Sequence, residues 1–158
     1  MIITVVTVGS LKEVYLKEAV TEYKKRLSQY ARVEEINIKE EPIKNEDSQD
    51  EITRALDLEG KKILAALPKD SYKIALAIEG IEYSSLQLAG IINSVQDSTG
   101  KLTLVIGSSH GMSESVKREC DRCLSFSKLT FPHQLIRVIL YEALYRSFTI
   151  IAGKKYHK

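Results

Sequence analysis

The sequence of 158 residues lacks several signatures that assign common functions. It contains no G-x-x-x-x-G-K-[ST] loop and no G-x-G-x-x-G motif, so neither familiar loop for nucleotide phosphates is predicted. No apolar run approaches the ~20 residues that cross a membrane, and the opening MIITVVTVG has no charged leader of the kind found in signal peptides. We therefore expect a cytoplasmic protein without a membrane segment.

Cysteine is scarce, since the chain has only Cys120 and Cys123, spaced as a single C-x-x-C. A tetrahedral zinc site needs four ligands and no second pair exists, although His110 is a third candidate ligand. A thioredoxin-like pair would stand at the start of a helix, whereas this pair leads into an expected strand. We expect no metal and no redox function.

Charge is unevenly distributed although the net charge is only +2. Residues 128–158 contain six Lys or Arg and one acid, Glu142, whereas residues 31–60 contain ten acids and four basic residues. Because nucleic acids are polyanions, a nucleic-acid partner would meet the C-terminal part of the chain.

Apolar runs and amphipathic stretches alternate along the chain. Near-continuous apolar runs such as TLVI and IALAI are typical of strands buried on both faces. The expected strands cover residues 2–8, 33–38, 73–78, 102–106 and 123–126. The expected helices begin after a cap at Ser10, ahead of Ile52, at Ser84, near Ser113 and at Pro132. The alternation predicts an α/β fold, with a mostly parallel sheet and helices on both faces, in a single domain of residues 1–158.

Ligands of such sheets bind beyond the carboxyl ends of the strands. Three expected loops lie there, at residues 79–80, 107–111 and 127–130. The last of them precedes a helix opened by Pro132, whose first amides lack partners within the helix. Those amides, the positive end of the helix dipole and Lys128 predict a site that favours a carboxylate or a phosphate.

The loop at residues 107–111, GSSHG, also matches the G-x-S-x-G turn of α/β hydrolases, with Ser109 as the nucleophile. Asp121 followed by His133 or His157 would keep the chain order of that triad. The short chain and the absence of a glycine-rich upstream loop for an oxyanion hole argue against this interpretation. In the simpler interpretation the two glycines only permit a sharp turn.

The final helix is apolar around much of its circumference, which predicts that a second copy covers one side in a homodimer. His133 is either a base or a hydrogen-bonded turn residue. Arg137 either contacts a phosphate or carboxylate or makes a structural pair. Glu142 and Arg146 are spaced for an i,i+4 salt bridge.

The tail at residues 153–158, GKKYHK, is basic and carries one aromatic residue. Lysines there can meet phosphates while Tyr156 and His157 stack on an unpaired base, as is common in the binding of single-stranded or loop RNA.

Three segments, LVIGSSHG, LSFSKLTFPHQLIRVILYEALYR and the terminal YHK, resemble the RlmH (YbeA-like) family of SPOUT-class methyltransferases. The opening TVGSLKE, the IALAIEG segment and the chain length fit as well. The resemblance implies transfer of a methyl group from S-adenosylmethionine to N3 of a pseudouridine in a hairpin loop of bacterial 23S ribosomal RNA, within the assembled ribosome. It also implies a C-terminal trefoil knot and a homodimer with active sites at the subunit interface.

By the same resemblance, the cofactor contacts fall on residues of three loops: Leu76, Gly107, Phe126, Ser127, Lys128, Leu129, Thr130 and Phe131. The expected catalytic residues are His133, Arg137, Tyr156 and His157, and the further RNA contacts are Arg146, Lys154, Lys155 and Lys158. The chain departs from the family pattern at Ser108, where relatives commonly have glycine.

A sulfonium methyl group is already activated, so its transfer requires orientation of donor and acceptor and no metal. The base that removes the N3 proton stays open among His133, His157 and water. A ribosome-binding module without catalysis is a further alternative.

Overall fold

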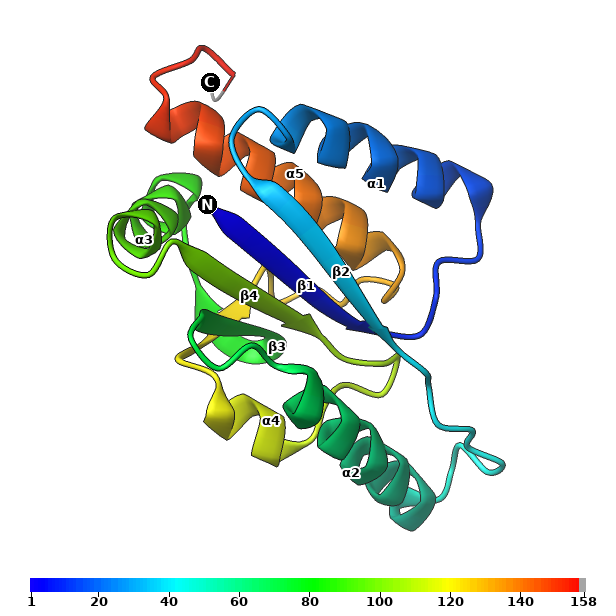
Figure 1. Ribbon diagram of the computed structural model, residues 1–158. Helices are drawn as coiled ribbons and strands as arrows, with labels where there is room; N and C mark the ends of the chain where they lie inside the picture. Colours follow the sequence, from blue (N-terminus) through cyan, green and yellow to red (C-terminus); the bar gives the residue numbers. More distant parts are fainter. Residues whose placement is uncertain (157–158) are drawn as a thin grey trace.

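Residues 1–156 are described in a computed structural model, in which strands and helices alternate along the chain (Figure 1). The elements are β1 (Ile2–Val8), α1 (Val14–Leu27), β2 (Arg32–Ile38), α2 (Gln49–Ala66), β3 (Tyr72–Glu82), α3 (Ser85–Asp97), β4 (Lys101–Ile106), α4 (Glu114–Glu119), β5 (Arg122–Ser125) and α5 (Leu135–Ile151).

The strands form one sheet in the order β2-β1-β4-β3-β5, and every neighbouring pair is parallel. β1 and β4 lie inside the sheet and are buried along almost their whole length. Their continuous apolar sequences follow from this position, because both faces of the sheet are covered.

Helices cover both faces of the sheet (Figure 1). α1, α3 and α5 pack on one face around an apolar cluster that includes Val20, Ile92 and Leu144. α2 and α4 pack on the other face around a smaller cluster that includes Ile63 and Val116. The predicted α/β fold with a parallel sheet between helices is therefore confirmed, while the trefoil knot stays an expectation from the family resemblance.

Two expected helix starts are wrong. Ser10 does not cap α1, which begins at Val14 after Glu13. α5 begins at Leu135, although the Pro132 carbonyl already accepts a hydrogen bond from the amide of Ile136. Residues 132–134 thus form a turn ahead of the helix, and the loop at the end of β5 is longer than expected.

β3 continues past its expected end at residue 78 because it contains a bulge. Leu124 of β5 pairs with Leu76 and again with Ile81, so residues 77–80 leave the ladder between them. Gly80 permits this path, since a Cβ there would lie only 2.7 Å from the backbone of Leu124. The bulge turns Glu79 towards the carboxyl end of the sheet.

Candidate functional site

A cavity of about 590 Å³ lies at the carboxyl ends of β3, β4 and β5. Its walls are the β3 bulge at residues 76–79, the loop at residues 106–112, and the segment after β5 at residues 124–127 and 129–133, with Lys117 and Ile136 completing them. The three loops that the sequence places at strand ends therefore converge.

Most residues expected to bind the cofactor line this cavity: Leu76, Gly107, Phe126, Ser127, Leu129, Thr130 and Phe131. His133 lines it too. Lys128 is exposed and is not among the lining residues. The expected corner for an anion is therefore not built around its ammonium group.

The loop at residues 107–111 is a tight turn closed on itself. The amide of Ser108 donates to the Gly111 carbonyl at 2.9 Å, and the amide of Gly111 donates back at 3.0 Å. Gly107 is essential to this turn, because a Cβ there would lie 2.0 Å from the Gly111 oxygen. Gly111 has φ +100°, whereas no described residue other than glycine has a positive φ. Ser108 thus takes an ordinary backbone conformation.

The segment after β5 is ordered by its own serines. Ser125 Oγ donates to the Ser127 carbonyl at 3.0 Å, and Ser127 Oγ accepts from the Leu129 amide at 3.0 Å. These bonds shape the wall of the cavity and leave the side chains of Leu129 and Phe131 exposed at its edge.

His133 is half-buried beside the end of β1. A Cβ added to Gly9 would lie 3.6 Å from His133 Nε2, and this nitrogen has no hydrogen-bond partner among the described residues. Burial, and then the positive charge of Arg137, lower the pKa of His133 below its usual value. Both effects favour the neutral imidazole.

Arg137 lies one turn further along α5 and is only 4% exposed. Its guanidinium donates to the carbonyl of Val8 at 2.8 Å and to that of Gly9, both at the carboxyl end of β1. Burial lowers the pKa of Arg137. Within one chain, this residue ties α5 to the sheet behind the cavity and is not among the lining residues.

Three of the other residues expected to act in catalysis or RNA binding lie in the second half of α5 or after it: Arg146, Lys154 and Tyr156. Arg146 pairs with Glu142 at 2.6 Å, as its spacing predicts, and the Tyr156 hydroxyl donates to Glu142 at 3.3 Å. Lys154 lies over the ring of Tyr30, 4.8 Å from its centroid. Lys155 is exposed, while His157 and Lys158 lie outside the described residues.

The length of α5 separates these residues from the cavity. Ile136 near its start lines the cavity, whereas Arg146 comes ten residues later, about 15 Å along the axis at 1.5 Å per residue, and Tyr156 packs against Glu142 and Tyr145. Within one chain, the structure therefore does not bring Arg146, Lys154 and Tyr156 to the cavity that His133 lines.

A hydrolase triad is not formed. Asp121 precedes β5 and accepts a hydrogen bond from the Lys73 amide at the amino end of β3. Ser109 follows the carboxyl end of β4 and lies 3.2 Å from His110 Nδ1. In a parallel sheet these two positions are at opposite edges, so Asp121 cannot orient a histidine against Ser109.

The cysteine pair has no metal-site geometry around it. Both thiols are free, and burial, followed by the charge of Cys123, raises the pKa of Cys120 to about 12. Among residues 1–156, no group of three or more His, Cys, Asp or Glu is placed to hold a metal ion. Over the same residues, no helix is both long and apolar enough to cross a membrane.

Sequence reasoning missed two charged residues near the cavity. Lys117 lines the cavity and is held by Glu79 and Glu114. Glu59 of α2 is only 2% exposed, and its Oε1 accepts from the amide of Glu41 at 2.9 Å. Burial raises the pKa of Glu59. Each lies on an amphipathic helix, where the pattern predicts a solvated charge.

A parallel α/β sheet with one cavity formed by loops at three neighbouring strand ends defines a ligand-binding α/β protein. A family model described as "Predicted SPOUT methyltransferase" matches residues 1–157. The chain therefore belongs to the SPOUT methyltransferase family, and the resemblance predicted from the sequence is confirmed.

Curated relatives are similar over their full length. A protein from Caldicellulosiruptor bescii is 48% identical over 156 residues, 99% of each chain, and one from Shouchella clausii is 46% identical over 159 residues, 100% of each. Both are named "Ribosomal RNA large subunit methyltransferase H". The crystal structure of a probable methyltransferase from Bordetella pertussis Tohama I has a TM-score of 0.60 at 13% identity, covering 92% of this chain and 93% of that one, which shows a shared fold.

Proposed function

We propose that this chain transfers a methyl group from S-adenosylmethionine to N3 of a pseudouridine in a hairpin loop of 23S ribosomal RNA, within assembled cytoplasmic ribosomes. The observation that carries the proposal is the cavity at the carboxyl ends of β3, β4 and β5, in a chain of the SPOUT methyltransferase family. The names of the full-length relatives support ribosomal RNA as the substrate. The pseudouridine N3 position follows from the resemblance alone.

The residues of the cavity suit a methyl donor with a nucleoside at one end. Leu76, Ile106 and Phe126 supply apolar wall, and Gly107 permits the tight turn that forms another part of it, because a Cβ there would clash with the Gly111 oxygen. A cavity of about 590 Å³ falls in the usual range for small-molecule sites. The bound donor supplies an activated methyl group, and the walls of the cavity hold it in orientation.

Removal of the N3 proton requires a base near the acceptor. His133 lines the cavity, its lowered pKa favours the neutral imidazole, and its Nε2 is buried without a hydrogen-bond partner among the described residues. These properties make it our candidate base, with His157 and water as alternatives. Arg137 holds α5 to the end of β1 one turn after His133 and serves as its positioning residue.

The position of the tail supports an active site shared between two chains. Tyr156 packs back onto α5 against Glu142 and Tyr145, and neither it nor Lys154 lines the cavity. The cavity edge exposes apolar side chains, with Ile78 62% and Leu129 72% exposed. A second copy that covers this edge would bury those residues and bring its own tail to the cavity. In the homodimer, Arg146, Lys154, Lys155 and Lys158 bind RNA phosphates, while Tyr156 and His157 lie near the target base.

Methyl transfer from labelled S-adenosylmethionine into bacterial ribosomes tests the proposal. Ribosomes from cells that lack the corresponding methyltransferase should accept label at one 23S nucleotide, which mapping should identify as a pseudouridine modified at N3. Ribosomes from the parent cells are the matched control, because their site is already methylated. Absence of S-adenosylmethionine binding by calorimetry would instead favour a ribosome-binding module without catalysis.

A further inference from the structure

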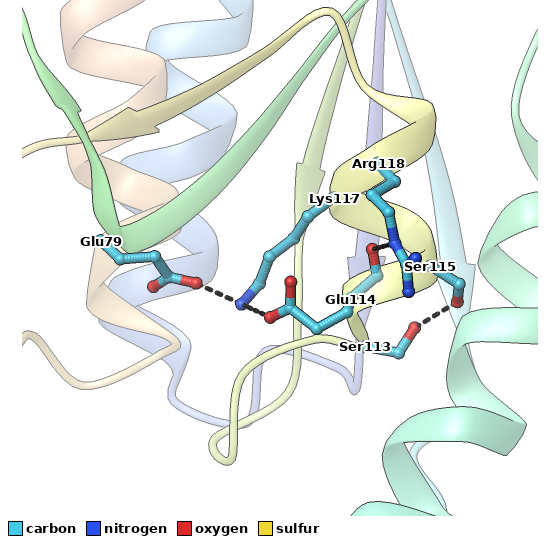
Figure 2. A network of polar contacts seen from close by, with 6 residues as sticks. All are labelled: Glu79, Ser113, Glu114, Ser115, Lys117 and Arg118. Carbon is cyan, nitrogen blue, oxygen red and sulfur yellow. Dashed lines mark hydrogen bonds and ion pairs between the residues drawn. The ribbon is translucent and has the colours of Figure 1, made fainter.

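An ion-pair network lies in the wall of the cavity and has no part in the chemistry above. Lys117 extends from α4 between two carboxylates, that of Glu79 on the β3 bulge and that of Glu114 at the start of α4 (Figure 2). Lys117 Nζ contacts Glu79 Oε1 and lies 2.8 Å from Glu114 Oε1. Glu79 and Lys117 line the cavity, whereas Glu114 is not among the lining residues.

Lys117 keeps Glu79 ionised and in place. The hydrogen bond from Lys117 lowers the pKa of Glu79, so this carboxylate is charged at neutral pH. Burial works against the charge of Lys117, but its hydrogen bonds to Glu114 and Glu79 outweigh burial and raise its pKa. The Glu79 side chain is still 60% exposed, and a carboxylate offers about four lone-pair sites, so it retains capacity for a ligand.

We propose that Glu79 accepts hydrogen bonds from the ribose hydroxyls of the bound methyl donor, with Lys117 as its positioning residue. This inference rests on the proposed function, because it assigns part of the same cavity. Carboxylates bind ribose hydroxyls in the same way at strand ends of other nucleotide-binding parallel sheets. The cationic groups of the donor are poorer partners, since Lys117 already places a positive charge beside this carboxylate.

Calorimetry with S-adenosylhomocysteine and its 2′-deoxy and 3′-deoxy analogues tests the contact. Glu79→Ala should bind S-adenosylhomocysteine about 10-fold more weakly, the effect of losing one hydrogen bond to a charged group. Glu114→Ala is the matched control, because it removes the other partner of Lys117, a carboxylate that does not line the cavity. Its affinity for S-adenosylhomocysteine should stay within about twofold of the wild-type value. At least one deoxy analogue should bind the wild type about 10-fold more weakly than S-adenosylhomocysteine does. On Glu79→Ala the same analogue and S-adenosylhomocysteine should bind with nearly equal affinity, because the contact is already lost.

5′-Methylthioadenosine, which keeps the ribose and lacks the amino-acid part, separates ribose from the rest of the donor. It should lose affinity for Glu79→Ala by the same factor as S-adenosylhomocysteine. An unchanged affinity of 5′-methylthioadenosine would assign Glu79 to the amino-acid part and overturn the proposal. The proposal would also be overturned if removal of a ribose hydroxyl weakened binding by the same factor in the wild type and in Glu79→Ala. If Glu79→Ala does not fold, Glu79→Gln replaces it with the same expectation in direction.

The two proposals fail in distinguishable ways. A wild-type protein that binds none of these nucleosides would remove the proposed function and this contact together. If the wild type and Glu79→Ala bind these nucleosides with equal affinity, the contact proposed for Glu79 is wrong, and the proposed methyl transfer to ribosomes still stands.

Discussion

Gly107 and Gly90 have opposite surroundings, which makes them a matched pair for testing the turn in the cavity. A Cβ at Gly107 would lie 2.0 Å from the Gly111 oxygen, whereas a Cβ at Gly90 in α3 meets nothing within 4 Å. Gly107→Ala should therefore lower the free energy of unfolding by about 1–3 kcal/mol, the usual cost of overpacking. It should also weaken S-adenosylmethionine binding at least about 10-fold if the turn shifts by the width of a methyl group.

Gly90→Ala should leave ligand affinity unchanged and raise stability slightly, because alanine is the better helix former by about 1 kcal/mol. Urea unfolding and calorimetry on the two variants measure both effects. Equal behaviour of the two variants would show that the turn tolerates a side chain at position 107.

His133 should make the folded protein less stable as the pH falls, because its pKa is lower in the folded chain than in the unfolded chain. Burial, and then Arg137, disfavour the charged imidazole in the folded chain, with Glu40 acting in the opposite sense and Lys12 adding to the lowering. Below about pH 6.5 the unfolded chain binds a proton that the folded chain does not. The stability from the neutral imidazole is thus present above that pH and is lost as the pH falls.

Urea unfolding of the wild type and of His133→Gln, between about pH 7.5 and about pH 5.5, checks this dependence. The wild type should lose more free energy of unfolding over that interval than the variant. The comparison also removes the contribution of Glu59. Its raised pKa makes stability fall as the pH rises, and this effect is the same in both proteins. Parallel curves would show that His133 titrates normally.

The residues around the cavity could be predicted to different extents. Gly107 follows an expected strand, and a strand end is visible in the sequence, so the pattern alone places it near a ligand. Leu76 lies within an expected strand and was placed by the family resemblance. Glu59 and Lys117 could not be found in this way. Their burial depends on the Glu41 amide and on Glu79, which are distant in sequence and meet them only in the folded chain.

α5 joins the cavity to the C-terminal tail, because one end of the helix borders the cavity and the other carries the tail. His133 precedes its first turn, and Tyr156 follows its last turn against Glu142. The apolar pattern predicted the helix correctly but placed its start at Pro132. That proline suits the start of a helix, and its carbonyl does accept the Ile136 amide, so the local signal cannot distinguish the preceding turn from the first turn.

Deletion of residues 156–158 should abolish methyl transfer and leave S-adenosylmethionine binding within about twofold. The reason is position, because Tyr156 packs against Glu142 and Tyr145 on α5 and does not line the cavity proposed to bind the donor. Calorimetry and turnover on ribosomes measure the two effects separately. Unchanged turnover would contradict the role of the tail, and a loss of donor binding would place the tail in the cavity of its own chain.

The α/β architecture could be predicted from the alternation of strands and helices, because each element carries its own periodicity. The β3 bulge could not, since it depends on where Leu124 of β5 meets Leu76 and Ile81. The homodimer was predicted from the apolar circumference of α5, while the knot and the interface position of the active site come from the family resemblance. The knot and the interface position of the active site both depend on how distant segments lie relative to one another, and no local sequence pattern predicts this.

A shared active site predicts complementation between two inactive variants. Thr130→Trp should fill the cavity from an exposed lining position, and deletion of residues 156–158 should remove the tail, so each protein alone should be inactive. After unfolding and joint refolding at equal amounts, about half of the dimers should be mixed, and each mixed dimer has one intact cavity facing one intact tail.

Turnover on ribosomes should therefore recover to about a quarter of the wild-type value, since half of the dimers carry one working site in place of two. Light scattering on each variant controls for loss of dimerisation. A mixture as inactive as its components, with dimers intact, would show that cavity and tail act within the same chain and would overturn the shared site.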